Sequence, residues 1–582
     1  MLPTSKCLTL FTILGTLFLL SCSNPNDQEV FSEQVRIRIN QAPDRLNPIL
    51  SSYASSVQIE RWLFNALQEY DPTTMVMTPV LLEESPQIST LDVGNGKSAT
   101  QVDFRIRSDA RWDNGEPITG RDYLFTMKAC LVPDIENSSW KNFVSQITDI
   151  RLDDEDSQSV SVLANEAYMQ LEEIITGFSV YPEYVYDSAG LLQDYSFKYL
   201  VGLSADSAVD ENLRVFAKQF NSAEFSRENV IGSGAYELIE WKSQQSILLR
   251  RKDNWWGNDL DASNHPFLRA EPAELLYYII PDEQTAITSL KDGALDLVSE
   301  ITPEQFQELK KYQNSERPIE LFAPSILQYY YIACNTQRAA LSDPLTRKAL
   351  AHLIDIKLMI EELFYNEALP TIGPLHPTKN AYASDLEPYG YDLSKARSLL
   401  AEAGWSDSDQ DGILDRRRQG ALEKLELKIN TTRSQLGQDV ATLLKQAAER
   451  VGVSLELNPM DTRAMLQDVR AGDYDLACLA ARPPAGNYDP YPNWHSDNVG
   501  ANGNNFCNFS NAALDQTIEK LRLTTDDKER DLLYYQFQKI LHDEQPAIFL
   551  VAPSTRIALN GKYKVLTSIL KPGYFENTIA PL

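Results

Sequence analysis

The sequence predicts an α/β protein, from two kinds of apolar spacing and one strand–helix–strand unit. Four short stretches alternate apolar and polar side chains as strands do: 35–39, 104–106, 247–249 and 275–280. Three longer stretches place apolar residues three and four apart, as amphipathic helices do: 394–403, 437–451 and 512–521. In the last third of the chain, LEKLELKIN, QDVATLLKQAAERVG and VSLELNPMD follow one another as strand, helix and strand. This βαβ unit builds parallel sheets, which indicates the class.

The chain begins with an apolar run. Residues 8–20 carry no charge and follow Lys6, and the run is shorter than the ~20 apolar residues that a membrane span needs. It is typical of a secretory signal peptide. Its end, Leu19-Leu20-Ser21-Cys22, resembles the bacterial lipobox, whose cysteine is acylated and becomes the new N-terminus. We therefore expect a lipoprotein signal peptide at 1–21, lipidation of Cys22 and a polar tether at 22–33; an ordinary cleaved signal is the alternative.

Length and charge limit what this leader exports. About 560 residues remain after cleavage, enough for three or four structural units. A net charge of -29 would repel a polyanion, so nucleic acid is excluded as a partner. Outside the leader, no segment is apolar enough to span a bilayer. The remaining cysteines (Cys130, Cys334, Cys478 and Cys507) form no C-x-x-C pair, which favours buried free thiols over a zinc site; a Cys478–Cys507 disulfide is the alternative.

The sequence shows no catalytic motif. The five histidines are isolated, so there is no H-E-x-x-H helix, and there is no G-x-S-x-G turn around a nucleophile. A pair of catalytic carboxylates would leave no spacing signal among 82 acidic residues, so a hydrolase stays an alternative. The simpler interpretation is that the protein is not an enzyme and requires no cofactor.

Eight short blocks follow one another from about residue 35 to the C-terminal half. They are RLNP (45–48), RWLFNAL (61–67), WDNGEPIT (112–119), IGSGAY (231–236), NWWG (254–257), LKDGALDL (290–297), DPLTRKAL (343–350) and ARSLLAEAGW (396–405). In content and order they resemble the signature of the bacterial extracellular solute-binding proteins of family 5, the peptide and nickel class that serves ATP-driven importers.

This resemblance implies a type II fold of the periplasmic-binding-protein kind, with two lobes around a hinged cleft and an extra inserted domain. Lobe I would comprise 34–67, 227–327 and 548–582, the inserted domain 68–226, and lobe II 328–547. The chain would cross between the lobes near 327–332 and near 548–552, where both runs are apolar and strand-like. Closing such a hinge buries a solute and creates a surface that a permease can recognise.

The resemblance also suggests where a ligand binds. In oligopeptide binders an aromatic hinge segment lines the cleft, and Gln328-Tyr329-Tyr330-Tyr331 is similar to it. Alternate residues of a strand face opposite ways, so we expect one or two of these tyrosines to face ligand. The family's ammonium-binding aspartate lies in a segment that corresponds to 479–490 here, where Pro484 or Asn487 takes its place. The predicted ligand-binding residues are Tyr329, Tyr330, Tyr331, Arg482, Asn487, Tyr488 and Asp489, with Arg482 favouring an anionic group or Asp489 taking the ammonium.

An acidic loop predicts a separate metal site. Asp407, Asp409, Asp411 and Asp415 occupy the first, third, fifth and ninth places of a calcium loop, and Gly412 occupies the sixth. The glutamate expected at the twelfth place is Arg418. A weakly held structural Ca²⁺ and a metal-free acidic turn are therefore both open.

Three functions remain. The first is a lipid-anchored receptor, facing the periplasm or the exterior, for a peptide or other small solute; its partners would be an ABC permease and ATPase, and it would act as a monomer. The second is the same fold binding a non-peptide solute such as a nickel chelate or an oligosaccharide. The third is an envelope hydrolase or chaperone-like protein without a permease.

Overall fold

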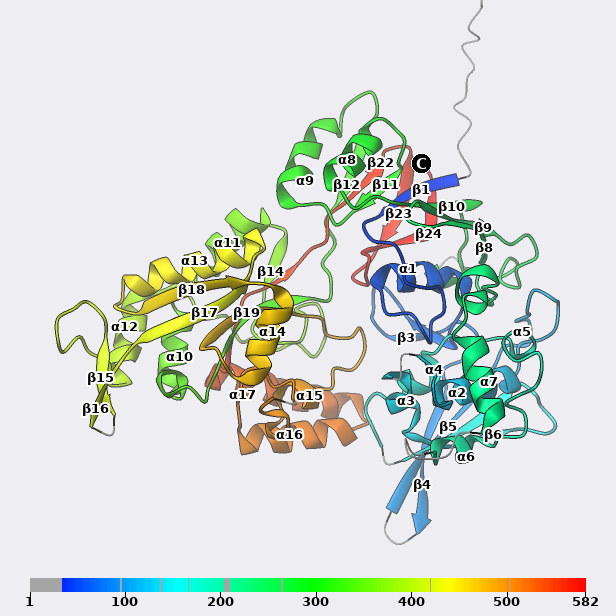
Figure 1. Cartoon of the computed structure of the whole chain (residues 1–582), viewed down its shortest axis with the longest axis horizontal. Coiled ribbons are helices and arrows are strands. Elements are labelled where there is room, and N and C mark those ends of the chain that lie inside the picture. Colours follow the sequence, from blue (N-terminus) through cyan, green and yellow to red (C-terminus); the bar gives the residue numbers. More distant parts are fainter. Residues whose placement is uncertain are drawn as a thin grey trace, which may run out of the picture.

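Two bodies built on separate sheets make up the chain (Figure 1). The computed structural model describes residues 34–94, 97–136, 139–165, 167–203, 210–262, 265–418, 420–501 and 503–582. The predicted α/β class is confirmed, and the fold has two lobes. Both large sheets are mixed: β10, β1 and β11 are parallel in one, and β18, β17 and β19 are parallel in the other. The predicted signal peptide, Cys22 and the tether lie outside the described residues.

The first body contains a seven-stranded sheet. Its order is β12 (Ile319–Phe322), β22 (Ile557–Asn560), β11 (Leu297–Ser299), β1 (Gln34–Ile39), β10 (Glu274–Ile279), β9 (Ser246–Arg251) and β8 (Tyr236–Lys242). Strands β1 and β10 run parallel; β10 alternates between buried and less buried residues throughout, as the period-2 pattern predicts, whereas β1 alternates only at its start and is then buried on both faces. Packed around the sheet are α1 (Ala54–Leu63), α8 (Glu283–Lys291), α9 (Pro303–Leu309) and the hairpin of β23 (Tyr563–Thr567) and β24 (Tyr574–Pro581).

Residues 68–228 extend this body at the end away from the chain's C-terminus (Figure 1). They form an antiparallel sheet ordered β4 (Gln87–Gly94), β5 (Lys97–Arg105), β7 (Ser159–Ala164) and β6 (Ile147–Leu152), together with the pair β2 (Gln68–Tyr70) and β3 (Met77–Pro79). Their helices are α2 (Gly120–Leu131), α3 (Ser139–Val144), α4 (Leu171–Thr176), α5 (Glu183–Tyr186), α6 (Phe197–Val201), α7 (Glu211–Phe220) and a π-turn at Glu224–Glu228.

The second body is built on a five-stranded sheet ordered β18 (Ser454–Met460), β17 (Glu426–Thr432), β19 (Leu476–Ala481), β13 (Tyr329–Cys334) and β20 (Ala547–Phe549). The predicted βαβ unit is confirmed, because β17 and β18 are parallel and α13 (Gln435–Glu449) connects them. The other helices are α10 (Pro344–Ala351), α11 (Ile356–Phe364), α12 (Leu393–Glu402), α14 (Thr462–Ala471), α15 (Tyr491–Trp494), α16 (Ala512–Leu523) and α17 (Asp527–Glu544). Two small hairpins are β14 (Ala368–Pro370) with β21 (Val551–Pro553), and β15 (Asp415–Arg418) with β16 (Ala421–Lys424).

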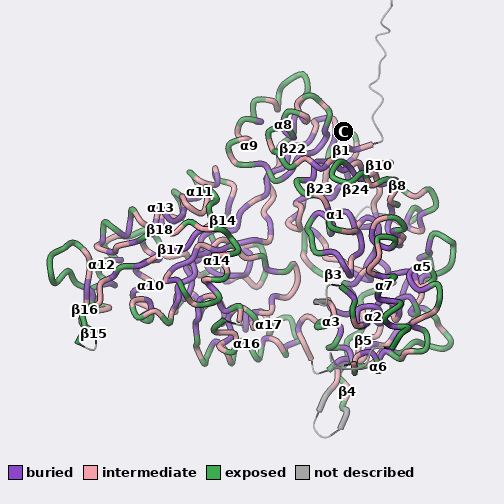
Figure 2. Tube along the Cα trace, viewed as in Figure 1, coloured by how far each residue is buried: buried purple, intermediate pink, exposed green. Residues whose placement is uncertain are grey.

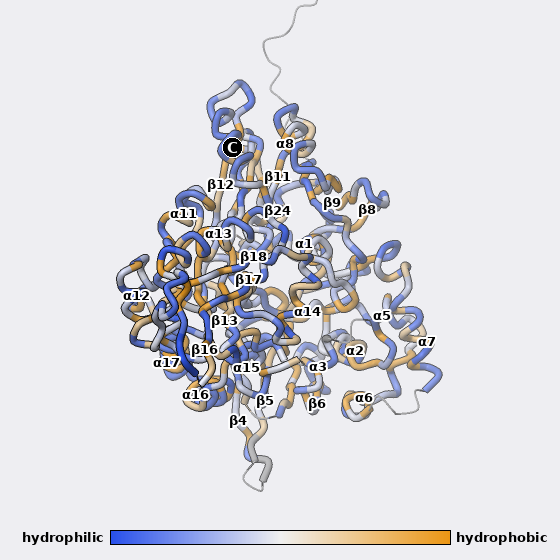
Figure 3. Tube along the Cα trace, turned by 60° about the vertical axis from the view of Figure 1, so that its left-hand side comes forward, coloured by the Kyte–Doolittle hydropathy of each residue, from blue (hydrophilic) through white to orange (hydrophobic). Residues whose placement is uncertain are grey.

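The apolar cores follow this division. One cluster joins the seven-stranded sheet to the inserted region, whereas two clusters lie on opposite faces of the five-stranded sheet. Buried segments run along the strands and the inner helix faces in Figure 2. In Figure 3 hydrophilic stretches dominate the outer turns of the molecule. Each body therefore has a core of its own, and Met169 of the inserted region packs into one cluster of the second body.

Two further expectations bear on the described residues. No helix among them is long and apolar enough to cross a membrane. Cys130, Cys334, Cys478 and Cys507 are all free thiols, which agrees with the favoured prediction. The predicted domain boundaries stay a proposal. Because β20 and β21 still pair within the second body, we propose that the second crossing lies slightly later, at 554–556.

Candidate functional site

Two chain segments connect the bodies and lie side by side. One runs from β12 to β13 and the other from β21 to β22, and they form an antiparallel bridge between Ser325 and Ser554. The N–H of Thr555 donates to the carbonyl of Pro324 at 2.9 Å, and that of Ile326 to Pro553 at 3.2 Å. Two short chain segments that pair between separate cores have the geometry of a hinge.

A pocket opens beside this hinge, and both bodies line it. It encloses about 1350 Å³ including its mouth. Glu300, Arg556 and Lys571 come from the first body, and Tyr330 and Arg482 come from the second. We call it the hinge pocket.

The three predicted tyrosines divide between the two faces of β13. Tyr329 and Tyr331 are 5% and 7% exposed and pack on Phe549, with ring centroids 5.8 and 6.2 Å away. Tyr330 points to the other face, packs on Phe364 and lines the hinge pocket. The alternation expected for a strand thus brings one tyrosine of the three to this pocket.

Charged groups of both signs surround Tyr330. The Arg482 guanidinium donates to Gln328 Oε1 at 3.2 Å. Arg556 pairs with Glu367 at 2.5 Å, and Lys571 lies 3.8 Å from Glu300. The pKa of Lys571 is lowered by burial first and by the positive charge of Arg482 second. Two cations from different bodies therefore repel one another across the pocket, and an anion between them would relieve that repulsion.

The hinge pocket also receives the N-terminus of α13, because Gln435, Leu436 and Asp439 of its first turns line the wall. The positive end of a helix dipole favours an anion. Acidic side chains of the same wall, including Glu362 and Asp439, give the pocket places for a cation as well. The arrangement suits a solute with separated charges.

The predicted residues 487–489 lie elsewhere, in a contact between the bodies that we call the edge contact. Here residues 168–173 of the inserted region meet residues 487–489. Asn487 donates its backbone N–H to Glu173 Oε1 at 2.8 Å and its side-chain NH₂ to the Met169 carbonyl at 2.9 Å. The Gln170 amide donates to the Asn487 carbonyl at 2.7 Å.

Asp489 is already paired within the edge contact. Its carboxylate accepts hydrogen bonds from Arg522 Nε at 3.0 Å and from the Tyr168 hydroxyl at 2.9 Å, and its side chain is 8% exposed. Tyr488 is buried, and its hydroxyl accepts a hydrogen bond from Trp494 Nε1 at 2.9 Å. The ligand-binding roles predicted for these residues stay predictions, and the structure separates them from Tyr330 and Arg482.

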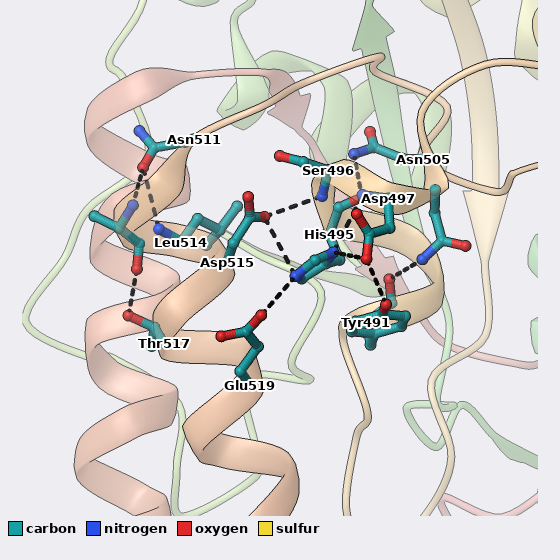
Figure 4. Close-up of polar contacts among 12 residues, drawn as sticks. Tyr491, His495, Ser496, Asp497, Asn505, Asn511, Leu514, Asp515, Thr517 and Glu519 are labelled. Carbon is teal, nitrogen blue, oxygen red and sulfur yellow. Dashed lines mark hydrogen bonds and ion pairs between the residues drawn. The ribbon is translucent and has the colours of Figure 1, made fainter.

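A second layer of contacts positions Arg522. The Tyr491 ring lies 4.3 Å from the Arg522 guanidinium and stacks on the His495 imidazole at 4.2 Å. Figure 4 shows this imidazole facing two carboxylates of α16: His495 Nε2 is 3.9 Å from Asp515 and 3.6 Å from Glu519. These contacts hold α16, which carries Arg522, against the segment that follows Asp489.

The acidic loop gathers three of its four predicted carboxylates. Oxygens of Asp407, Asp409 and Asp415 lie within 4.8 Å of one another. Asp411 instead contacts the Lys424 ammonium, which also lies 3.1 Å from Asp409, and these two carboxylates raise the pKa of Lys424. The three clustered groups are hard oxygen donors of the kind that Ca²⁺ prefers, so the donor set fits this ion. The Lys424 ammonium, from β16, already occupies one of these carboxylates, Asp409.

Sequence reasoning missed several residues of these sites. Glu300 and Lys571 reach the hinge pocket only through the fold of the first body, and residues 168–173 carry no motif. These residues lie far along the chain from Arg482 and Asn487, so no local sequence pattern could predict that they share a site.

Comparisons with known proteins place the chain in a family. The family model of bacterial extracellular solute-binding proteins, family 5 (middle), matches residues 84–503, well over half of the chain. The chain belongs to this family. Its members bind solutes and are not enzymes, so the prediction of a non-enzymatic protein is confirmed. The family description also places its members outside the cytoplasm.

Three relatives illustrate the likeness. The oligopeptide-binding protein AppA of Bacillus subtilis is 22% identical over 520 residues, which cover 89% of this chain and 86% of AppA. The substrate-binding protein CtaP of Listeria monocytogenes has a structure with a TM-score of 0.72 and 20% identity, covering 94% of this chain and 99% of CtaP. NikZ of Campylobacter jejuni, solved with Ni(L-His), has a TM-score of 0.65 and 20% identity, covering 92% and 95%. These structures confirm the two-lobed fold.

Proposed function

We propose that this protein is the lipid-anchored substrate-binding component of an ABC importer and that it closes its two bodies over an oligopeptide or a similar small solute. The observation that carries the proposal is the hinge pocket, which both bodies line beside two paired crossings. Rotation about those crossings changes the distance between the walls of the pocket, so a bound solute shifts the equilibrium between open and closed arrangements. A permease can distinguish the closed arrangement from the open one, so this protein needs no catalytic residue.

Within the hinge pocket, Tyr330 and Arg482 are the proposed ligand contacts. Tyr330 offers an aromatic face and a hydroxyl at the hinge, and Arg482 offers a guanidinium that suits a carboxylate. Tyr329, Tyr331 and Tyr488 support the pocket from the core behind β13. Asn487 and Asp489 act by joining the bodies at the edge contact.

A peptide is the favoured solute because the long relative AppA is named for oligopeptide binding and its match spans most of both chains. The same fold holds a nickel chelate in NikZ, so a non-peptide solute is the second candidate. Both solutes carry separated charges or metal-bound carboxylates, which the mixed charges of the hinge pocket accommodate. A chaperone-like function without a permease is the third candidate, and permease and ATPase genes beside this one would exclude it.

The membrane attachment rests on the sequence at Cys22. A lipid at this residue and a tether at 22–33 would keep the receptor near its permease. For the acidic loop we propose a weakly held structural Ca²⁺ on Asp407, Asp409 and Asp415, far in sequence from the ligand contacts.

Identification of small molecules that copurify with the protein tests the proposed function. Native mass spectrometry of the purified protein, followed by mild unfolding and analysis of what is released, should yield a peptide or a small charged solute. That solute should bind the emptied protein again in calorimetry. Release of no solute, together with no binding from a library of short peptides and metal chelates, would refute the proposal.

A further inference from the structure

A second pocket lies at the edge contact, away from the hinge. It spans about 1660 Å³ including its mouth, and residues 70–77 and α4 of the inserted region form one wall. Residues 375–381, 485–488 and part of α17 form the other. One side chain of this second wall, Lys379, turns toward the chain segment 484–486 of its own body.

The Lys379 ammonium has three main-chain acceptors. Nζ donates to the carbonyl of Pro484 at 3.1 Å and to that of Ala485 at 2.7 Å, and it also contacts the carbonyl of Gly486. The carboxylate of Glu173 lies on the opposite body and attracts the same ammonium. An ammonium has three N–H donors and no acceptor, so the three carbonyls form a matched receptor for a primary amine, and the negative charge of Glu173 favours its charged form.

The surroundings hold this receptor in place. Asn487 donates its N–H to Glu173, which fixes the carboxylate beside residues 484–486. On the lysine side, the N–H of Lys379 donates to the carbonyl of His376, and the N–H of Thr378 donates to His376 Nδ1. The backbone that carries Lys379 is therefore already ordered, which lowers the entropic cost of placing its ammonium.

Burial changes the pKa of the Lys379 ammonium. It lowers the pKa of Lys379 to about 8, although Glu173 opposes the shift. Burial also raises the pKa of Glu173. Both groups therefore lie in a partly dry site, and their opposite charges attract each other.

We infer that Lys379 fills an ammonium-binding subsite from within the chain, so that the solute is not recognised there through a free amino group. This inference rests on the proposed function and deepens it. An attached side chain competes at high effective concentration with any free amine, so a ligand ammonium does not displace it at ordinary concentrations. The solutes that fit are those whose amino end is blocked, absent or directed elsewhere, with their recognition left to the anion-favouring hinge pocket.

Chemical rescue tests the subsite directly. Lys379→Ala removes the internal ammonium and leaves the three carbonyls and Glu173 in place. We expect ethylammonium chloride to raise the melting temperature of this variant saturably, beyond the effect of equal sodium chloride, because a ligand that binds the folded state stabilises it. Wild type and the control Lys539→Ala, which removes an exposed lysine paired with Asp543, should respond to both salts alike. An equal response of Lys379→Ala to the two salts would overturn the inference.

Calorimetry with trialanine and N-acetyl-trialanine gives a second readout. Its wild-type measurement is informative even if Lys379→Ala does not fold. Wild type should bind both within about threefold, whereas Lys379→Ala should prefer the free amine by about tenfold or more, the usual size of a charged hydrogen bond. A tenfold preference of wild type for the free amine would contradict the inference. If wild type binds neither peptide, the peptide part of the proposed function fails, and the ethylammonium experiment still decides the inference.

Discussion

Arg482 is the residue whose removal should separate binding from folding. Arg482 is an exposed residue that lines the hinge pocket, and its guanidinium makes a hydrogen bond to Gln328. For a solute with a carboxylate, we expect Arg482→Ala to weaken binding about ten- to a hundredfold, because a charged hydrogen bond in a closed cleft contributes about 1.5–3 kcal/mol. Calorimetry with the copurified solute measures the loss, and exposed Arg417→Ala is the matched control.

The charge of the ligand decides how this result is interpreted. An amide analogue of a carboxylate ligand should bind wild type and Arg482→Ala equally. If the amide loses as much affinity as the acid does, Arg482 acts by shaping the pocket and the proposed carboxylate contact is wrong.

Glu60 on α1 makes the stability of the first body depend on pH. It is 4% exposed, and burial raises its pKa to about 8, although the Ser51 hydroxyl donates to its carboxylate. Between pH 4.5 and 8 the folded state therefore binds a proton more tightly than the unfolded state. The free energy of unfolding falls as pH rises through that window.

Glu60→Gln removes this titration while keeping an acceptor for Ser51. We expect the variant to match wild type near pH 4.5 and to be more stable at pH 8, by on the order of 2–4 kcal/mol. Urea unfolding at the two pH values measures the difference. A constant difference between the proteins at both pH values would refute the assigned titration.

At the scale of the element, the acidic loop between α12 and β15 offers a test with calcium. Ca²⁺ at Asp407, Asp409 and Asp415 would have to displace the Lys424 ammonium from Asp409. We expect chelation to lower the melting temperature of wild type but not of Asp409→Ala with Asp411→Ala, since an ion bound to the folded state stabilises it by mass action.

Lys424 supplies the matched comparison for that experiment. Lys424→Met removes the competing cation, so this variant should gain more from added Ca²⁺ than wild type does. Identical melting curves with and without chelator in all three proteins would show that the loop is a metal-free acidic turn.

The elements also show how far the sequence could predict this structure. The helices at 393–402, 435–449 and 512–523 and the βαβ unit were predictable because their apolar spacing is local. Alternation along β13 was predictable for the same reason. Which face of β13 would meet the hinge pocket was not predictable, because it depends on how the strand packs on Phe364 and Phe549, which both follow it at a distance along the chain.

The site at 487–489 was predicted as a ligand contact because residues 479–490 correspond to the family's segment that carries the ammonium-binding aspartate. Its pairing with Arg522 and with residues 168–173 depends on the inserted region, whose sequence carries no sign of where it docks. Lys379 lies more than a hundred residues before the carbonyls that it contacts. Such contacts join residues that are far apart along the chain, within one body or between the two, and no spacing rule records them.

At the scale of the whole molecule, the hinge and the edge contact both affect the opening and closing of the two bodies. The edge contact lies away from the crossings, so a small displacement there corresponds to a rotation of the bodies about the hinge. Gly486 is the tightest point of this contact: a Cβ atom on it would lie 1.8 Å from the Tyr70 hydroxyl and 2.1 Å from Glu173 Oε1. These atoms belong to the opposite body, so a methyl group at 486 must push the bodies apart or shift the loop.

We therefore expect Gly486→Ala to open the molecule while leaving each core intact. Small-angle X-ray scattering of the solute-free variant should give a larger radius of gyration than wild type, and far-UV circular dichroism should be unchanged. Solute should bind more weakly, because part of its binding energy must now overcome the clash on closing. Gly390→Ala is the control, since a Cβ atom at that position has no neighbour within 4 Å. Equal scattering from both variants and wild type would mean that the 484–487 loop absorbs the methyl group, and the edge contact would then not limit the opening of the two bodies.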